Sequence, residues 1–339
     1  MPLKRFIQAA VAAEHLDSAQ AREAMWHVMR GEATPAQIAA WLVALRQKRE
    51  TIEEIVGFAT AMREAMTPLA AVSADAIDTC GTGGDGLGTF NISTAAALIA
   101  AACGVPVAKH GNRAVSSQSG SADVLAALGF EIDPGQEVVA QALARTGFAF
   151  MFAPRFHPAM RHAAAPRREI GVRTVFNMLG PLCNPARVKR QIVGVFDRSR
   201  AREIAAALAS LGAERALVIS GPDGADEILP TGENLVVEWD GRALGEHHLR
   251  PEDLGVEPCD LAALHGGSAE ENAAIIRAIA GGKDGARADA ALVNAAAALY
   301  VAGEAATLVD GVELARAAIH DGRVADLIRR AADASRRIG

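Results

Sequence analysis

Residues 78–121 constrain this chain more than any other stretch, because they read as strand, glycine loop, helix, strand and polar loop in succession. The loop GTGGDG occupies 81–86, and NIST at 91–94 opens an alanine-rich run that stops at Gly104. Glycines let the backbone take positive φ and approach a ligand closely, while the following helix points free N–H groups and its positive dipole end back at the loop. This arrangement predicts an anion site, with phosphate as the expected ligand.

The loop is not a Walker loop, because no Gly-Lys-Ser/Thr follows the glycines, and it imitates the dinucleotide fingerprint only loosely. Taken alone, it is equally compatible with a tight connection. A second short strand is predicted at 105–108, and its carboxyl end carries KHGNR at 109–113, followed by several serines. Ligands bind outside the carboxyl ends of strands in open α/β sheets, so both loops should face one crevice.

The motifs GTGGDG, TFNIST, KHGNRAVSS and GSADVL resemble those of the anthranilate phosphoribosyltransferases of tryptophan biosynthesis. The segment FHPAMRHAAAPRREIGVRTVFNMLGPLCNP and the pair Asp226-Glu227 fit the same family, so the resemblance covers most of the chain. Two departures are Cys183, where the family usually has Thr, and GPDGA at 221–225 before the acidic pair. The resemblance implies transfer of a 5-phosphoribosyl group from phosphoribosyl pyrophosphate to the amine of anthranilate, with release of pyrophosphate.

The predicted fold class is α/β, with a small, mostly helical N-terminal domain and a larger domain on a mostly parallel central sheet, like nucleoside phosphorylases and phosphoribosyltransferases. Residues 1–70 read as helices, with capping-box signals that begin at Asp17, Thr34 and Thr51. The resemblance implies that about 155–187 complete this domain. The domain that binds phosphoribosyl pyrophosphate would then comprise 71–154 and 188–339.

Further elements are expected from apolar runs and turn signals. Strands are predicted at 148–152, 192–196, 216–220 and 235–239. Helices are predicted from a cap at Asp133-Pro134 to Ala144, and at 268–280, 288–301 and 312–338.

The resemblance assigns both polar loops to phosphoribosyl pyrophosphate. The residues so assigned are Gly81, Gly84, Asp85, Thr89, Asn91, Ile92, Ser93, Thr94, Lys109, His110, Gly111, Asn112, Arg113, Ala114, Val115, Ser116, Ser117 and Ser121. A carboxylate in an anion-binding loop repels phosphate unless it holds a metal or a ribose hydroxyl. Asp85 is therefore interpreted as a donor contact, with a plain turn former as the alternative. Lys109 can offset the charge of pyrophosphate.

Adjacent carboxylates on a loop suit Mg²⁺, which takes one or two carboxylates together with water and substrate oxygens. Asp226 and Glu227 follow the strand that ends at Ser220. Such a pair is usually solvated surface, and the resemblance is what favours a metal role. It also nominates Ser93 as a further magnesium contact, against the alternative of simple helix capping.

Anthranilate is a flat ring with a carboxylate, for which a planar guanidinium is a natural partner. The resemblance assigns to this acceptor Gly81, His110, Asn112 and Arg167, and it places Arg167 at the cleft. The alternative for Arg167, as for the neighbouring arginines, is a solvated basic face. No general base is sharply indicated, because a neutral arylamine can attack as pyrophosphate departs; His110 could take the proton late.

Composition and net charge limit the functional classes and cellular locations that this chain can have. The net charge of −6 argues against a binder of duplex DNA. Four scattered cysteines without a CxxC pair favour reduced thiols, and the N-terminal apolar run is too short for a signal or a membrane span, so a cytoplasmic location is expected.

A small helical domain rarely buries its own apolar stripes fully, and the resemblance implies a homodimer formed through it. Two alternative functions stay open. A pyrimidine nucleoside phosphorylase shares the architecture that the resemblance implies, although its glycine loop and base-binding residues differ from the motifs seen here. A nucleic-acid-binding relative would need a strongly basic surface, against which the net charge speaks.

Overall fold

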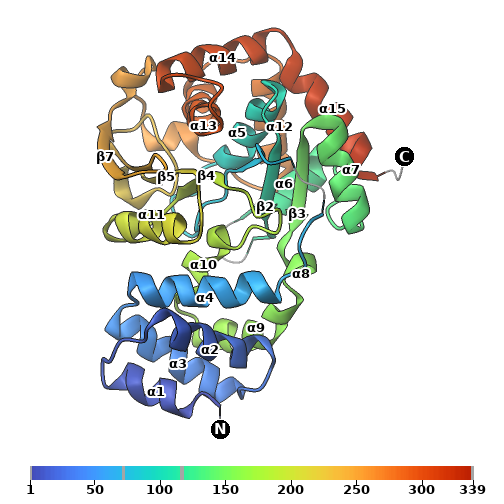
Figure 1. Cartoon of the computed structure of the whole chain (residues 1–339). Helices are drawn as coiled ribbons and strands as arrows, with labels where there is room; N and C mark the ends of the chain where they lie inside the picture. Colours follow the sequence, from blue (N-terminus) through green and yellow to red (C-terminus); the bar gives the residue numbers. More distant parts are fainter. Residues whose placement is uncertain (1, 71–72, 115–117, 337–339) are drawn as a thin grey trace.

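A sheet with the strand order β3-β2-β1-β4-β5-β6-β7 runs through the larger of two lobes (Figure 1). The computed structural model describes residues 2–70, 73–114 and 118–336. The strands are β1 (Ile77–Asp78), β2 (Val107–Gly111), β3 (Phe148–Phe152), β4 (Arg190–Gly194), β5 (Arg215–Ser220), β6 (Asn234–Trp239) and β7 (Leu244–Leu249). The first five pair in parallel, whereas β6 and β7 are antiparallel to their neighbours. The predicted mostly parallel sheet is confirmed.

The order in which strands are added to the sheet reverses at β1. Ile77 pairs with Val107 of β2 on one side and with Arg190 of β4 on the other. The chain first builds outward from β1 to β2 and β3, and then returns to place β4 on the opposite side of β1. Ligands of open α/β sheets bind at such a switch point, outside the carboxyl ends of the strands. The glycine loop leaves β1 at this point.

Helices cover both faces of the sheet, and alternate residues of one strand enter different cores. Leu217 of β5 packs in the core with helices α5 and α13, while the next residue, Val218, packs in the core that contains α11. The covering helices are α5 (Ile92–Ala102), α6 (Ser121–Leu128), α7 (Gln136–Thr146), α11 (Ala201–Ser210), α12 (Ala269–Ala280), α13 (Ala286–Ala302), α14 (Leu308–His320) and α15 (Arg323–Arg336). The α11 face of the sheet meets the smaller lobe (Figure 1).

The smaller lobe begins with four helices, α1 (Lys4–Val11), α2 (Ser18–Met29), α3 (Pro35–Lys48) and α4 (Ile52–Ala65). The three predicted capping boxes are confirmed, because Asp17, Thr34 and Thr51 each accept from the backbone N–H three residues later and receive the reciprocal bond. Trp41 is fully buried, with its ring edge-on to Phe58 at 5.3 Å, so it is a packing residue.

The chain returns to this lobe after β3, through α8 (Ala153–Phe156), α9 (Arg161–Ile170) and α10 (Phe176–Leu182). Helix α9 packs on α2 and α3, while α10 packs on α4 (Figure 1). One hydrophobic core joins these helices to Val193 and Val218 of the sheet. The predicted limits of the two domains stay a prediction, because the apolar core runs without a break from one lobe into the other.

Several predicted element limits are wrong. Strand β4 lies two residues earlier than predicted. Strand β2 begins two residues later than predicted, so Lys109 and His110, which were expected to follow it, belong to the strand itself. Helix α7 is preceded by Gly135, not capped by Asp133, because the Asp133 carboxylate pairs with Arg155 instead. The predicted helix over 312–338 is two helices, interrupted at Gly322, where φ is +73°.

Strand β7 was not predicted. Its three central residues are polar and exposed and none of its residues is buried, because it forms the edge of the sheet, and so it lacks the alternation that marks a half-buried strand. The four cysteines are free. Within the described ranges, no helix has both the length and the apolar character needed to cross a membrane.

Candidate functional site

The glycine loop after β1 holds an unusual run of positive φ angles. Gly83, Gly84, Gly86 and Gly88 all have φ between +67° and +80°, a region that other residues rarely adopt. In the described part of the chain, the backbone N–H groups of Gly84, Asp85 and Gly86 have no hydrogen-bond partner. Consecutive free amides in such a turn form a concave site for an anion. The predicted anion-binding character of the loop therefore has a structural basis.

A carboxylate from the far side of the switch point holds this loop in place. Asp226 Oδ2 accepts a hydrogen bond from the Gly83 amide at 2.6 Å. The same oxygen lies 2.6 Å from where a Cβ on Gly81 would stand, so only glycine allows the loop to approach it this closely. Asp226 thus fixes the conformation of the glycine loop, in addition to any role in binding a ligand.

Glu227 makes a corresponding contact at the start of α5. Its Oε1 accepts from the Ser93 amide at 2.9 Å. The amides of Ile92 and Thr94 donate to the Phe90 and Asn91 carbonyls. The prediction of free N–H groups at this helix start is wrong for this structure, because a carboxylate and local carbonyls already occupy them.

The two half-buried carboxylates of the acidic pair carry like charges. Burial, and after it the nearby charge of Asp85, raises the pKa of Asp226 to about 6. Burial, followed by the charge of Asp226, raises the pKa of Glu227 well above its ordinary value. Asp85 also accepts from the Leu87 amide at 3.1 Å, so both of its interpretations, turn former and participant in the site, have support.

A divalent cation fits this donor set, because hard oxygen ligands and unrelieved negative charge are what Mg²⁺ favours. Among the described residues, no three His, Cys, Asp or Glu side chains converge as a complete metal cage. Substrate and water oxygens would therefore have to complete the coordination, as is usual for Mg²⁺.

Lys109 lies on the interior strand β2 and is 2% exposed. Its Nζ donates to the Thr79 carbonyl and hydroxyl at 3.3 and 3.2 Å. Asp78 accepts from the His110 amide and from Asn184 Nδ2, the latter at 2.7 Å. This network fixes β1, β2 and the returning segment to one another. Sequence reasoning missed Asp78 and Asn184, whose only signal was a polar residue inside an apolar stretch.

His110 is buried against His157, with the ring centroids 5.0 Å apart. Burial, and after it the neighbouring His157, lowers the pKa of His110 to about 3. The pKa of His157 is lowered to about 4 by burial. Both rings are therefore neutral at pH 7, and His110 accepts a proton reluctantly in this arrangement.

The polar loop after β2 is organised by Asp123 of α6. Its carboxylate accepts from the amides of Ala114 and Gly120 and pairs with the Arg113 guanidinium. Asn112 is exposed, and its carbonyl accepts from the Ser121 hydroxyl. Three residues assigned to the donor, Val115, Ser116 and Ser117, lie outside the described ranges.

The remaining predicted residues differ in how accessible they are. Ile92 and Thr94 are fully buried, whereas Thr89, Asn91 and Gly111 are half-buried. Asn91 is fixed by two hydrogen bonds, donating to the Ser119 carbonyl and accepting from Asn272. The side chains of Ile92 and Thr94 therefore contribute to the core rather than to an open crevice.

Arg167 lies on α9, with its guanidinium 5.1 Å from the centroid of the Phe176 ring. Burial lowers its pKa, and no described carboxylate forms an ion pair with it. Arg168, the next residue, is exposed. An uncompensated guanidinium stacked on an aromatic ring can receive a planar carboxylate.

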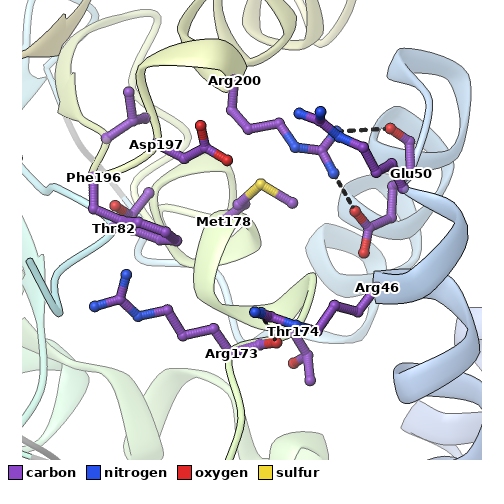
Figure 2. Close-up of a pocket in the computed structure, with 11 residues that line it drawn as sticks. Arg46, Glu50, Thr82, Arg173, Thr174, Met178, Phe196, Asp197 and Arg200 are labelled. Carbon is purple, nitrogen blue, oxygen red and sulfur yellow. Dashed lines mark hydrogen bonds and ion pairs between the residues drawn. The ribbon is translucent and has the colours of Figure 1, made fainter. Parts of the chain in front are cut away.

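A cavity of about 270 Å³ lies beside the glycine loop, between the two lobes. Figure 2 shows Arg200 reaching Glu50 on one side, and Arg173 extending toward Phe196 and Thr82 on the other. Its lining was not predicted, apart from the general basic character of the segment around Arg173. The residues come from segments far apart in sequence, and each looks locally like ordinary surface charge.

Two family models match the chain. One, described as "Glycosyl transferase family, a/b domain", covers residues 73–325, and the other, "Glycosyl transferase family, helical bundle domain", covers residues 4–66. The anthranilate phosphoribosyltransferase of Moorella thermoacetica is 51% identical over 95% of each chain. That of Chloroflexus aggregans is 50% identical over 99% of each chain.

The chain belongs to the anthranilate phosphoribosyltransferase family. The anthranilate phosphoribosyltransferase of Thermus thermophilus superposes with a TM-score of 0.93 at 46% identity, covering 98% of this chain and 99% of that one. A Saccharomyces cerevisiae anthranilate phosphoribosyltransferase solved in complex with PRPP and Mg gives a TM-score of 0.91 at 27% identity, covering 99% and 98%. The predicted fold class and the family resemblance are confirmed.

Proposed function

We propose that this chain transfers the 5-phosphoribosyl group of phosphoribosyl pyrophosphate to the amine of anthranilate, releasing pyrophosphate, in the biosynthesis of tryptophan. The observation that carries the proposal is the contact between Asp226 and the Gly83 amide, which brings an acidic pair to a loop with free amides. The reaction is inferred from family membership, and the position of the active site is inferred from this contact.

The donor would lie with its pyrophosphate over the free amides of Gly84, Asp85 and Gly86. Lys109 and the half-buried Asn91 would flank it, together with the loop after β2. Mg²⁺, held by Asp226, Glu227 and Ser93 when bound, would neutralise the charge that develops on departing pyrophosphate. The Ser93 amide must share Glu227 with the metal in that arrangement, because they are hydrogen-bonded here.

The acceptor would lie between Arg167 and the carboxyl end of β2, near Gly81, His110 and Asn112. Arg167 is the natural partner of the aromatic carboxylate, because it is half-buried and lacks a described ion-pair partner. This placement orients the amine toward C1 of the donor, so that positioning and charge stabilisation do most of the catalysis.

A role for His110 as late proton acceptor is not favoured, because its pKa of about 3 makes protonation costly. The arylammonium that forms on attack is itself acidic, and we expect water or a phosphate oxygen to take its proton. His110 would then serve as a neutral wall of the acceptor site.

A single assay tests this function. Purified protein with anthranilate, phosphoribosyl pyrophosphate and Mg²⁺ should lower the fluorescence of anthranilate, and leaving out either the donor or the metal should abolish the decrease. Phosphorolysis of uridine or thymidine when inorganic phosphate is supplied, with no change in anthranilate fluorescence in the first assay, would instead support a nucleoside phosphorylase. Binding of duplex DNA without any turnover would support the third class.

We also propose a homodimer through the helical lobe. Val11 at the end of α1 and Val43 on α3 are 73% and 46% exposed, which places apolar side chains on the outside of that lobe. Sedimentation at micromolar concentration should give the mass of two chains. A cytoplasmic location stays a prediction.

A further inference from the structure

The cavity beside the glycine loop gathers more positive charge than its own carboxylates can neutralise. It is lined by four arginines, two from the end of α3, one from the loop before α10 and one that follows β4: Arg46, Arg49, Arg173 and Arg200. Figure 2 shows Arg46, Arg173 and Arg200 around one space, and Arg49 also lines it. We call this cavity the arginine pocket.

Among the residues that the structure describes, one of the four arginines has a carboxylate partner. Arg200 forms a buried ion pair with Glu50 at 2.6 Å and a second ion pair with Glu203. In the described ranges, Arg46, Arg49 and Arg173 have no carboxylate partner, and Asp197 is the one other acid in the lining. The pocket therefore keeps an excess of positive charge, which favours an anion.

The three unpaired guanidiniums are nevertheless held in place. Arg46 Nη1 donates to the Arg173 carbonyl at 2.6 Å, and Arg49 Nη2 donates to Ser199 Oγ at 2.8 Å. The Arg173 guanidinium stacks on the Phe196 ring at 3.9 Å. Each of them retains further N–H donors for a ligand, because a guanidinium carries five.

Two threonine hydroxyls in the lining also lack a partner. Thr82 Oγ1 and Thr174 Oγ1 are both buried from solvent and make no hydrogen bond within the described structure. Thr174 is only 6% exposed as a residue. Buried hydroxyls are normally hydrogen-bonded, because an unpaired one loses its contact with water without replacement, so a ligand with acceptor oxygens is the natural complement.

Backbone strain points to the same place. Arg49 has φ +66° and ψ +134°, a conformation that a residue with a Cβ rarely adopts. Strained residues of this kind tend to cluster at ligand clamps. The strain occurs where the chain leaves α3 and turns the Arg49 side chain into the pocket.

From the charge and the unpaired hydroxyls together, we propose that the arginine pocket is a second anion site that binds a small phosphate anion, inorganic pyrophosphate in particular. Its ligands would be Arg46, Arg49 and Arg173, with the hydroxyls of Thr82 and Thr174. Arg173 also lies against the glycine loop, since a Cβ on Gly84 would be 3.4 Å from its Nη2. If the proposed function holds, product pyrophosphate that leaves the glycine loop would bind next in this adjacent pocket before its release.

The test is calorimetric titration of inorganic pyrophosphate into the intact, metal-free protein, which requires no turnover. The parent should bind two equivalents, one at the loop and one in the pocket. Arg46→Gln combined with Arg49→Gln should weaken one of the two by about tenfold or more, because two charge-assisted contacts are lost. Arg202→Gln is the matched control, since Arg202 is exposed on α11 and outside the lining.

Thr174→Val provides a second test that preserves the fold. Valine has nearly the same shape, and no hydrogen bond within the described structure is lost, so thermal stability should be maintained or increased while pyrophosphate binding weakens a few-fold. A single equivalent in the parent would overturn the proposal, as would equal losses in the double variant and the Arg202 control. Tighter binding of anthranilate than of pyrophosphate at this site would overturn the assignment to phosphate anions. Intact pyrophosphate binding without turnover would contradict the proposed function alone.

Discussion

Gly194, the last residue of β4, lies directly against the backbone of Asp226: a Cβ on Gly194 would stand 1.5 Å from the Asp226 carbonyl oxygen. The acidic pair therefore reaches the glycine loop only because β4 ends without a side chain. This contact links the sheet to the position of both carboxylates.

Gly194→Ala should displace the acidic pair. The clash is with backbone and cannot be relieved by a side-chain rotation, so we expect a loss of stability of about 1–3 kcal/mol. A shift of about 1 Å at the carboxylates should lower kcat/KM for phosphoribosyl pyrophosphate about 100-fold. Gly135→Ala is the control, because a Cβ there meets nothing within 4 Å. Parent-like kinetics for Gly194→Ala would show that the pair does not need this position.

Asp226→Asn with Glu227→Gln should stabilise the protein and inactivate it at the same time. Burial raises both pKa values, as do the charge of Asp85 next to Asp226 and the charge of Asp226 next to Glu227. Neutral amides therefore remove an unfavourable charge at pH 7 and should raise the free energy of unfolding by at least about 1 kcal/mol. Turnover should fall about 100-fold or more, because departing pyrophosphate loses its metal-assisted stabilisation. Asp223→Asn, three residues upstream, is the control. Retention of activity within a few-fold at low magnesium would contradict the metal assignment.

Arg167→Ala should affect the acceptor and spare the donor. Loss of a charge-assisted contact to the anthranilate carboxylate should cost about 1.5–3 kcal/mol, or roughly 10- to 150-fold in kcat/KM for anthranilate. Arg168→Ala should be mild, since that side chain is exposed. Aniline, which lacks the carboxylate, should be a poor substrate for the parent and lose little more. Equal losses with both acceptors would mean that Arg167 acts on structure or on the donor.

Stability should fall in mild acid because of the histidine pair. The folded pKa values of His110 and His157, about 3 and 4, lie below the ordinary 6.5, so the unfolded chain binds protons first as the pH drops. Their contribution is complete above pH 6.5 and is lost between there and about pH 3–4, at about 1.4 kcal/mol per pH unit for each ring. Urea unfolding at pH 7 and pH 5 measures it. His157→Gln should remove about 2 kcal/mol of this pH dependence, whereas exposed His247→Gln should leave it unchanged.

The parts of the fold that follow from local chemistry could be predicted. Capping boxes at Asp17, Thr34 and Thr51 involve residues three positions apart, and the glycine loop between β1 and α5 is a contiguous signal. The parallel sheet and the two-lobed arrangement also followed from alternating elements and from family resemblance.

What could not be predicted depends on contacts between distant segments. Glu227 accepts from the Ser93 amide across 134 positions in the sequence, so the helix start that looked free in the sequence is occupied. The arginine pocket joins residues around 46, 173 and 200, each of which resembles ordinary surface charge in its own segment. Burial of His110, which decides its protonation, depends in the same way on His157 and the returning segment.

The return of the chain to β1 affects how the protein folds while the ribosome synthesises it. Strand β1 comprises only Ile77–Asp78, and its second neighbour, β4, begins at Arg190, more than a hundred residues later. On the ribosome, the glycine loop therefore remains anchored on one side only until β4 emerges, and α2 and α3 lack their partner until α9 emerges shortly before it. Long-range pairing of this kind slows folding and leaves apolar surface exposed in the meantime. We expect nascent chains that stop before residue 190 to depend on chaperones, and chains extended past β5 to become protease-resistant.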